Sequence, residues 1–328
     1  MFRPLSIPSP PPSWTGFSIG IFTIHTYALC ILTGIVVGVL VTGWRLRQRG
    51  APAGVVLDVG FFAVLLGITA ARFYHVFTHP NDYFAPGVPF WKIFAIWEGG
   101  NAIFGALIGG AVGVWIGCRI TGIRFLAFAD ALAPGLLLAQ GIGRLGNYFN
   151  TELYGMPTNL PWGLEVPSSN PAFPAGLAEG TLFHPTFLYE LIWDVVGAFL
   201  ILAIENKVRR DPLRLEPRYP LRWGRGLAFY LIWYGVGRSV FESIRIDPSE
   251  VFFGLRVNVW AAFASVLLGV ILFIAAARHP GTEPSVYRPG REPALPQPLD
   301  SRYTEADFED PGSETVAQPS TSGSAARR

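Results

Sequence analysis

The sequence predicts an all-α polytopic membrane protein with about seven transmembrane helices, a small irregular extracytoplasmic cap and a disordered C-terminal tail. Composition is the first reason. Of the 328 residues, 51% are hydrophobic and 15% are charged, whereas roughly one quarter of the residues in a soluble domain are charged. The second reason is that several apolar windows approach or exceed the roughly 20 residues that a helix needs to cross a hydrocarbon core.

The predicted spans divide the chain into a transmembrane domain, residues 1–277, and a tail, residues 278–328. The first apolar run is too long for the h-region of a cleaved signal peptide, so we expect it to remain as a span. The fourth window is the least regular, because it is short and contains Asp130 and Pro134. The seven windows lie near residues 20–43, 54–78, 100–119, 124–142, 186–205, 225–244 and 257–277.

Basic residues accumulate in alternate loops and predict the orientation of the chain. Loops rich in lysine and arginine stay in the cytoplasm, and the other loops are poorer in these residues, with Lys92 alone between the second and third spans. We therefore expect the N-terminus outside and the C-terminus in the cytoplasm. The basic residues of the three cytoplasmic loops are Arg45, Arg47 and Arg49; Arg119 and Arg124; and Lys207, Arg209, Arg210, Arg214, Arg218, Arg222 and Arg225.

The composition of the chain changes at Arg278, after which Pro, Ser, Gly and charged residues dominate. Such a segment cannot bury enough apolar surface to offset its ordering entropy, so we expect a disordered cytoplasmic tail. Two outer segments, residues 79–99 and 143–185, are too long for simple turns and contain Pro, Gly and aromatic residues. They predict the irregular cap.

Several classes of function are disfavoured by composition. The net charge is only +2, which disfavours nucleic acid as a partner. Cys30 and Cys118 lie in or beside apolar helices without a CxxC pair or clustered histidines, so neither a disulfide framework nor a metal site is expected, and no cofactor is predicted. There is also no inverted pair of broken helices of the kind found in many secondary transporters.

Ionisable residues within predicted spans are functional candidates, because they are unfavourable in lipid unless paired or wet. In the sixth span, Tyr230, Tyr234, Arg238, Glu242 and Arg245 are spaced by four, four, four and three residues and so share one helix face. A structural ion pair between Arg238 and Glu242 is one interpretation. The additional guanidinium of Arg245 favours the other, an anion site. Further charged candidates are Arg72, Glu98, Asp130, Glu190 and Asp194.

A second polar cluster is the stretch GRLGNYFNTELYG, residues 143–155. Its glycines permit a bend or the close approach of a ligand, and its polar side chains supply hydrogen-bond donors and one carboxylate. Composition alone leaves both a turn at a helix end and a binding site open. The polar and glycine positions are Gly143, Arg144, Gly146, Asn147, Asn150, Glu152 and Gly155.

This stretch closely resembles the signature of the prolipoprotein diacylglyceryl transferase family, membrane enzymes that attach a diacylglyceryl group to bacterial prelipoproteins. The likeness extends to about residue 277, with the motifs in family order and on the expected helices, and the tail lies outside it. The other matching motifs are IHTYA, AARFYH, WEGGNAIFGALIGG, the AD of Asp130, HPTFLYE and GVGRSVFESIR.

The resemblance implies a reaction and a location. The diacylglyceryl moiety of phosphatidylglycerol passes to the thiol of the lipobox cysteine in the signal peptide of a prelipoprotein, forming a thioether and releasing glycerol phosphate. No metal or cofactor is required. The resemblance also implies a multi-pass protein embedded in the bacterial cytoplasmic (inner) membrane.

The same resemblance assigns roles to individual residues. Arginine suits a phosphodiester because its planar fork binds two phosphate oxygens at once, and we assign Arg144 and Arg238 to this task. We expect Glu152 and Glu242 to orient these arginines, and Tyr27 matches a family position tied to activity. The remaining candidates for substrate binding are Asn147, Asn150, Gly155, Glu190, Tyr234 and Arg245.

One departure from the family concerns the general base. Family members commonly read HGGL where this chain reads FGAL, so Phe104 stands at the position of the histidine that is proposed as a base. Phenylalanine cannot accept a proton. Either His25 is the base, or the field of the arginines lowers the pKa of the acceptor thiol and no side-chain base is essential.

Two other functions stay open from the sequence. A transporter or channel for an anionic solute also lines its pathway with buried arginines, although the polar motifs here gather toward one face. A non-catalytic lipid-binding scaffold is the second alternative. It predicts binding of phosphatidylglycerol without release of glycerol phosphate.

Overall fold

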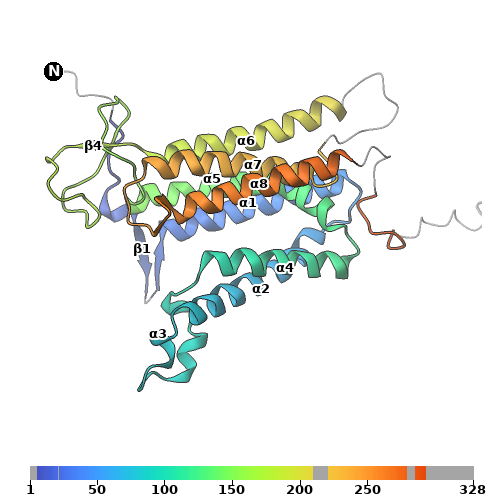
Figure 1. Ribbon diagram of the computed structural model, residues 1–328, viewed down its shortest axis with the longest axis horizontal. Coiled ribbons are helices and arrows are strands. Elements are labelled where there is room, and N and C mark those ends of the chain that lie inside the picture. The colour runs from blue at the N-terminus through green and yellow to red at the C-terminus, as the bar shows by residue number, and fades with distance from the viewer. Residues whose placement is uncertain (1–5, 21, 210–220, 279–284, 293–328) are drawn as a thin grey trace, which may run out of the picture. The chain divides into compact units, whose positions relative to one another are not determined.

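The computed structural model describes residues 6–20, 22–209, 221–278 and 285–292, and each structural statement below concerns these residues. The chain divides into two compact units, Met1–Arg291 and Glu292–Arg328, and every helix and strand belongs to the first. In Figure 1, α1, α5, α6, α7 and α8 lie side by side, and α2 and α4 form a pair beside them. The long helices are α1 (Thr26–Gln48), α2 (Val55–Thr78), α4 (Ile103–Thr121), α5 (Phe125–Asn150), α6 (Thr186–Arg209), α7 (Arg225–Ile244) and α8 (Val257–Ala277).

Each predicted span overlaps one of these helices. Within the described ranges, six of them, all except α7, are long and apolar enough to cross a membrane. Helix α7 occupies the sixth predicted span but carries the polar face described above. The largest difference in bounds is at α5, because hydropathy predicts its end near residue 142 and the helix continues to Asn150. Its last two turns carry Arg144, Asn147 and Asn150; Arg144 pairs with Glu190 of α6, and both asparagines bond to Glu152 just beyond the helix end.

Short elements form an irregular cap at one end of the long helices (Figure 1), as the sequence predicted. Three antiparallel strand pairs belong to it, one before α1, one in the loop after α5 and one between α7 and α8. The pair in the α5–α6 loop lies over a small apolar core that includes Tyr154, Phe183 and Phe187. The elements are β1 (Gly16–Ile19) with β2 (Phe22–His25), β3 (Leu164–Glu165) with β4 (Leu182–Phe183), β5 (Val251–Phe252) with β6 (Leu255–Arg256), α3 (Asn81–Phe84), and the 3₁₀ turns η1 (Pro12–Trp14), η2 (Phe90–Phe94) and η3 (Ile96–Glu98).

Helix α4 packs closely against α2 because glycine recurs at every fourth position on one of its faces. At each of these positions an added Cβ would overlap atoms of α2, most of them backbone atoms. Small residues of this kind let helix backbones approach one another in a membrane, where van der Waals packing stabilises the contact. The residues are Gly105, Gly109, Gly113 and Gly117.

Arg45 of α1 supplies a hydrogen-bond donor that α5 lacks. Pro134 has no N–H, so the carbonyl oxygen of Asp130, four residues earlier, cannot accept the usual helical bond. The Nη1 of Arg45 donates to this oxygen at 2.5 Å and to the carbonyl oxygen of Ala131 at 2.9 Å. Its Nη2 lies 2.6 Å from a carboxylate oxygen of Glu205 on α6. One buried guanidinium therefore joins α1, α5 and α6 and accommodates the proline.

Helices α6 and α7 are aligned by a pair of tryptophans. The rings of Trp193 and Trp233 stack with their centroids 4.2 Å apart and an interplanar angle of 19°. Each indole Nε1 donates a hydrogen bond to the backbone carbonyl of the other residue at 3.0 Å. Gly197 and Gly237 leave room for the rings. These reciprocal bonds fix which carboxylates of α6 face the arginines of α7.

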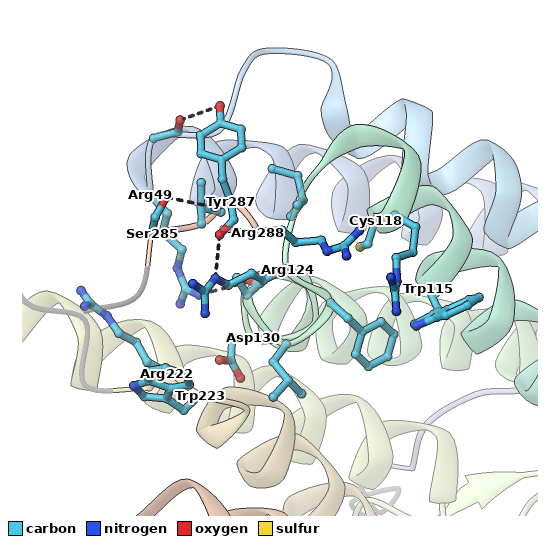
Figure 2. Close-up of a pocket in the computed structure, with 17 residues that line it drawn as sticks. Arg49, Trp115, Cys118, Arg124, Asp130, Arg222, Trp223, Ser285, Tyr287 and Arg288 are labelled. Atoms are coloured by element: carbon cyan, nitrogen blue, oxygen red, sulfur yellow. Dashed lines mark hydrogen bonds between the residues drawn. The ribbon is translucent and has the colours of Figure 1, made fainter. Parts of the chain in front are cut away.

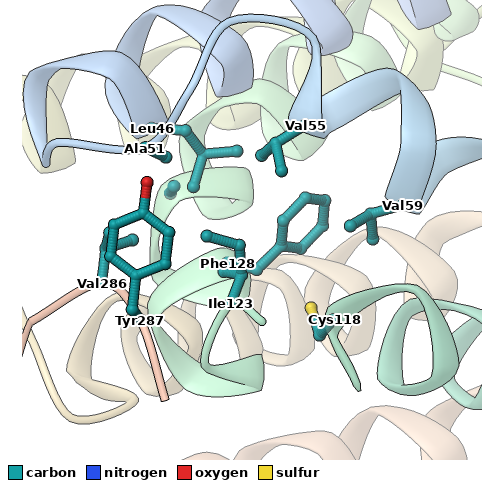
Figure 3. Close-up of a cluster of buried hydrophobic side chains, with 10 residues drawn as sticks. Leu46, Ala51, Val55, Val59, Cys118, Ile123, Phe128, Val286 and Tyr287 are labelled. Atoms are coloured by element: carbon teal, nitrogen blue, oxygen red, sulfur yellow. The ribbon is translucent and has the colours of Figure 1, made fainter. Parts of the chain in front are cut away.

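Residues 285–291 pack against the helices, and there the structure differs from the predicted disorder of the tail. Val286 and Tyr287 are buried in an apolar cluster with residues of α1, α2, α4 and α5 (Figure 3). The difference arises because two apolar side chains in an otherwise polar segment pack between the ends of the helices. Residues 279–284 and 293–328 of the predicted tail lie outside the described residues, as do Arg210, Arg214 and Arg218 of the predicted basic loop.

Candidate active site

Three helices bring two arginines onto one carboxylate at the capped end of the bundle. The Nη2 of Arg144, on α5, lies 2.7 Å from Oε2 of Glu190 on α6. The Nη1 of Arg238, on α7, lies 3.7 Å from the same oxygen. The structure thus brings together the two guanidiniums that the sequence assigns to one phosphate.

A cavity of about 340 Å³ opens beside Arg144. The Arg144 side chain is 20% exposed and that of Glu190 is 8% exposed, so the guanidinium lies between the cavity and the carboxylate. The ring of Tyr27 packs against the Cα of Gly146, where a larger residue would collide with it. Polar groups and aliphatic side chains of α1 share the walls, which suits an amphiphilic ligand. The lining residues are Tyr27, Ile31, Ile35, Ala139, Gln140, Gly143, Arg144, Asn147 and Leu153.

Glu242 of α7 is fully buried and contacts three guanidiniums. Nη2 of Arg238 lies 2.8 Å and Nη1 of Arg245 lies 3.5 Å from its Oε2. Nε of Arg256, just before α8, lies 3.0 Å from Oε1, which also accepts a hydrogen bond from Nδ2 of Asn258 at 2.9 Å. The ion pair between Arg238 and Glu242 is therefore real, but it belongs to a larger network.

This network contains four arginines and three carboxylates, so its ion-paired groups carry one net positive charge. Low-dielectric surroundings strengthen the attraction of such groups for an anion. Asp194, one turn beyond Glu190 on α6, is buried beside the network, and among the described residues no ion pair within 4.0 Å joins it to these arginines. The members are Arg144, Arg238, Arg245, Arg256, Glu190, Glu242 and Asp247.

Arg245 is held by two carboxylates rather than presented to the cavity. Its Nε and Nη2 donate to the two oxygens of Asp247 at 2.7 and 2.9 Å. Burial raises the pKa of Asp247, but hydrogen bonding and attraction from Arg245, together with the charge of Arg256, outweigh it, so the pKa of Asp247 lies below its ordinary value. Burial lowers the pKa of Arg245, and the bonds and charge of Asp247 with that of Glu242 raise it above its ordinary value. Both groups therefore stay ionised at neutral pH.

Glu152 contacts asparagines and not the arginines that it was expected to orient. Its Oε1 accepts hydrogen bonds from Nδ2 of Asn147 at 3.0 Å and Nδ2 of Asn150 at 3.3 Å, and no ion pair joins it to an arginine among the described residues. The reason is the helix end, where Thr151 adopts a left-handed conformation with φ of 51° and turns Glu152 back over the last turn of α5. The carboxylate on Arg144 is instead Glu190.

Gly155 and Tyr234 hold the neighbouring chain segments. The N–H of Gly155 donates to the carbonyl of His184 at 2.9 Å, and Gly155 also forms a β-bridge with Arg245. A Cβ at Gly155 would approach His184 and the carbonyl of Ile244 too closely, so glycine lets the α5–α6 loop pass the end of α7. Tyr234 stacks on Tyr230 and lines a narrow crevice with Glu190 and Arg238.

His25 and Phe104 both lie outside the described cavity and crevice at the arginines. The side chain of His25 is exposed, at the end of β2 and directly before α1, where its backbone pairs with Gly16. Phe104 is in the first turn of α4 and is 38% exposed. The geometry does not support His25 as the general base, whereas Tyr27, two residues later, lines the cavity.

Sequence reasoning missed Gln140, Arg256 and Asn258. Gln140 stands four residues before Arg144 and so on the same face of α5, a spacing that the sequence displays; its Nε2 donates to the hydroxyl of Tyr230 at 3.0 Å. Arg256 is an isolated basic residue between α7 and α8, and a count of charges for each loop gives it no weight. Asn258 follows two residues later, and only its contact with buried Glu242 distinguishes it from an ordinary residue near a helix start.

Comparison with known proteins places this arrangement in a family. Residues 15–275 match the family model described as prolipoprotein diacylglyceryl transferase. The chain is 61% identical over 302 residues to a phosphatidylglycerol–prolipoprotein diacylglyceryl transferase of Leifsonia xyli subsp. xyli, covering 89% of this chain and 87% of the relative. Its identity to the relative of the same name in Bifidobacterium adolescentis is 44% over 273 residues, covering 81% of this chain and 79% of the relative.

A similar relationship holds with a further relative, phosphatidylglycerol–prolipoprotein diacylglyceryl transferase 2 of Streptomyces coelicolor. The identity is 45% over 277 residues, which cover 84% of this chain and 83% of the relative. The matched region contains every long helix apart from the end of α8, and all of the ion-pair network. The comparisons give no support to a transporter or channel. The chain therefore belongs to the prolipoprotein diacylglyceryl transferase family.

Proposed function

We propose that this protein transfers the diacylglyceryl group of phosphatidylglycerol to the lipobox cysteine thiol of prelipoproteins. Membership of the family supports the reaction class. The observation that carries the residue assignments is the convergence of Arg144 and Arg238 on Glu190 beside an open cavity. Such a pair of guanidiniums, held in place before the substrate arrives, suits a phosphodiester.

The proposed chemistry is a displacement at carbon. The cysteine thiolate attacks the glyceryl carbon that is esterified to phosphate, a carbon–sulfur bond forms, and the carbon–oxygen bond to phosphate breaks. Glycerol phosphate leaves with the bonding electron pair, so negative charge grows on the phosphate in the transition state. Guanidiniums that already point at this group stabilise that charge without further reorganisation. We assign this role to Arg144 and Arg238.

Glu190 and Glu242 act as positioning residues in this proposal. Glu190 holds Arg144 at 2.7 Å, and Glu242 holds Arg238 at 2.8 Å. Both carboxylates are almost completely buried, with 8% and 0% side-chain exposure. Water therefore does not compete with the guanidiniums for these carboxylates. Each arginine keeps further N–H donors for the phosphate.

The remaining cavity residues suit the other parts of the lipid. We assign hydrogen bonding of the glycerol head group to Tyr27, Gln140 and Asn147, which line the cavity with Arg144. We place the start of the acyl chains along Ile31 and Ile35 of α1, because these side chains form its apolar wall. Asn150 and Glu152 keep the end of α5 in shape through their mutual hydrogen bond.

No side-chain base is required if the thiol is already acidic enough. In this proposal the guanidiniums of Arg144 and Arg238 lie beside the thiol that attacks the bound lipid, and positive charge close to a thiol lowers its pKa. Phe104 has no acid–base group, and His25 is exposed outside the cavity. We therefore propose that the acceptor thiol loses its proton to water in the field of the arginines.

The proposed orientation places the site at the outer face of the bacterial cytoplasmic membrane. The ends of α1 and α4 that lie away from the cap carry Arg45, Arg49 and Arg119, and the start of α5 follows Arg124. The positive-inside rule assigns that end to the cytoplasm. The N-terminus and the cavity beside Arg144 then lie outside, where a prelipoprotein signal peptide arrives.

The test is transfer in a defined system. Purified protein in liposomes of phosphatidylglycerol with a labelled diacylglyceryl group is mixed with a lipobox peptide, and a matched peptide with serine in place of cysteine is the control. We expect a labelled thioether on the cysteine peptide and an equal amount of glycerol phosphate. Binding of the lipid without release of glycerol phosphate would indicate a scaffold, and flux of an anionic solute without transfer would indicate a transporter.

A further inference from the structure

A second cavity, of about 620 Å³, lies at the other end of the long helices, and the proposed transfer does not use it. Its walls come from the ends of α1 and α4, the start of α5, the residues before α7 and residues 285–288 of the tail. Arg124 lines this cavity, and Arg144 lies 20 residues further along the same helix. At 1.5 Å per residue, the two cavities are about 30 Å apart along α5.

Arginine accounts for most of the charged side chains that line this cavity. Among the described residues that line it, Asp130 is the one acid. The carboxylate of Asp130 accepts hydrogen bonds from the backbone N–H groups of Gly224 and Leu227 at 2.9 Å each, so it caps the start of α7. Five arginines face it, namely Arg49, Arg119, Arg124, Arg222 and Arg288.

The carboxylates at this end neutralise only part of that charge. Glu205 pairs with Arg49 at 2.7 Å and also with buried Arg45. Within the described part of the chain, no ion pair joins Arg119, Arg124 or Arg288 to a carboxylate. Arg124 and Arg288 are partly buried, where water screens their charge less than at an open surface. Counted over the described residues, the cavity therefore has an excess of positive charge.

Two indoles hold guanidinium planes at the cavity. The guanidinium of Arg119 lies over Trp115 at 5.0 Å from the ring centroid, and that of Arg124 lies 5.9 Å from the ring of Trp223. Nε of Arg124 also donates to the carbonyl oxygen of Tyr287 at 2.6 Å. Figure 2 shows Arg124 near Arg288, with Trp115 on the opposite side. These contacts leave the terminal nitrogens of Arg124 as donors in a fixed plane, the geometry that phosphate oxygens require.

The tail segment forms part of the cavity wall. The N–H of Arg124 donates to the carbonyl of Val286 at 2.9 Å, and the N–H of Arg288 donates to the carbonyl of Gly122 at 2.8 Å. Tyr287, which is buried, also donates its hydroxyl to the carbonyl of Gly50 at 3.2 Å. The backbone thus places Arg288 beside the arginines of the helix ends.

We propose that this cavity binds the phosphate of an anionic phospholipid head group taken from the membrane leaflet at that end of the helices. The volume lies within the roughly 300–1,000 Å³ of small-molecule sites. Basic pockets between helix ends at the membrane surface are suited to phospholipid head groups, and tryptophan is enriched at the same depth. Several guanidiniums around one cavity match the several oxygens of a phosphate. The binding is independent of diacylglyceryl transfer at Arg144.

The probe is dioleoyl phosphatidic acid, added to the delipidated full-length protein in detergent, with bound lipid counted by native mass spectrometry. The test protein carries Arg119→Gln and Arg288→Gln. The matched control carries Arg47→Gln and Arg278→Gln, which remove the same charge from two exposed arginines outside the cavity. We expect at least tenfold weaker binding of one lipid in the test protein, about 1.4 kcal/mol, and wild-type binding in the control.

Further arms separate folding, ligand source and activity. If the double variant melts at a lower temperature than wild type, the single variant Arg119→Gln, at an exposed residue, replaces it. We then expect binding of the lipid to be about threefold weaker than in wild type. Glycerol phosphate and inorganic phosphate are not expected to displace the lipid at millimolar concentration, and full displacement would overturn the assignment to a lipid. Equal binding by test and control proteins would overturn the site itself. Transfer activity of both variants is expected to stay at the wild-type level.

Discussion

Arg144 of α5 and Arg238 of α7 share one carboxylate oxygen, Oε2 of Glu190 on α6, at 2.7 and 3.7 Å. Arg144 also lines the open cavity. The other terminal nitrogen of Arg238 lies 2.8 Å from Oε2 of Glu242. Because both carboxylates are buried behind the guanidiniums, the arginines are held in position before a lipid binds. Preorganisation of this kind is what electrostatic stabilisation of a departing phosphate requires.

The first prediction concerns the shape of the guanidinium. Arg144→Lys and Arg238→Lys each keep the charge but replace a planar fork by a point charge, so bidentate binding of phosphate is lost. We expect kcat to fall by about 100-fold in each variant, which corresponds to about 2.7 kcal/mol of transition-state stabilisation. Labelled transfer to the lipobox peptide measures it. Arg47→Lys, at an exposed arginine, is the control, and wild-type rates in both site variants would refute the phosphate assignment.

The second prediction concerns Glu190 as a positioning residue. Glu190→Gln leaves Arg144 without its 2.7 Å ion pair while a hydrogen-bonding side chain of the same shape remains. We expect kcat to fall by about tenfold or more with a smaller change in KM, because the lost term is the alignment of the guanidinium in the transition state. The matched control is Glu179→Gln in the cap. Equal loss in Glu190→Gln and Glu179→Gln would contradict the positioning role.

The third prediction concerns the general base, because Phe104 stands where family members have the proposed histidine and His25 is the alternative. His25→Gln is expected to keep transfer within about threefold of wild type, because the His25 side chain is exposed and outside the cavity, and general-base catalysis typically contributes at least 100-fold. The pH dependence of kcat over pH 6–9 should be the same in both proteins. A loss of 100-fold or more in His25→Gln would restore His25 as the base.

The sequence was sufficient to predict the helices and the polar face of α7, because both depend on local periodicity. The spacing of Tyr230, Tyr234, Arg238 and Glu242 defines one helix face whatever surrounds it. Hydropathy failed at the end of α5, since it records the loss of apolar residues after Gln140 and not the continuation of the helix. Arg144 there is paired with Glu190 of α6, and Asn147 and Asn150 bond to Glu152; a hydropathy window records neither kind of contact.

The partner of Arg144 was not predictable from local pattern for the same reason. Glu190 and Glu152 are both carboxylates near the capped ends of helices, and nothing in their spacing from Arg144 separates them. The face that α6 turns toward α5 and α7 is set by tertiary contacts, among them the reciprocal bonds of Trp193 and Trp233. The sequence indicated which residue types form the site, and packing decided which carboxylate pairs with Arg144.

The fourth prediction tests the register between α6 and α7. Gly237→Ala places a methyl group against the ring of Trp193, and the stacked pair must separate. We expect a loss of about 2 kcal/mol of stability by overpacking, with reduced transfer activity because α6 carries Glu190. Gly60→Ala on α2 is the control, since a Cβ there meets no atom within 4 Å; it should be neutral or slightly stabilising. Equal melting temperatures in detergent for the two variants would contradict the proposed packing.

The last prediction is a double-mutant cycle on Arg45 and Pro134. Arg45→Met removes the donor to the carbonyl of Asp130 and one of the two guanidiniums on buried Glu205, so we expect a loss of about 3 kcal/mol. In a background with Pro134→Ala, the alanine N–H can bond to the same carbonyl, and the loss should shrink by about 1 kcal/mol. Chemical or thermal unfolding of the four proteins in detergent gives the coupling energy. Strict additivity would show that Arg45 does not substitute for the helical hydrogen bond that proline removes.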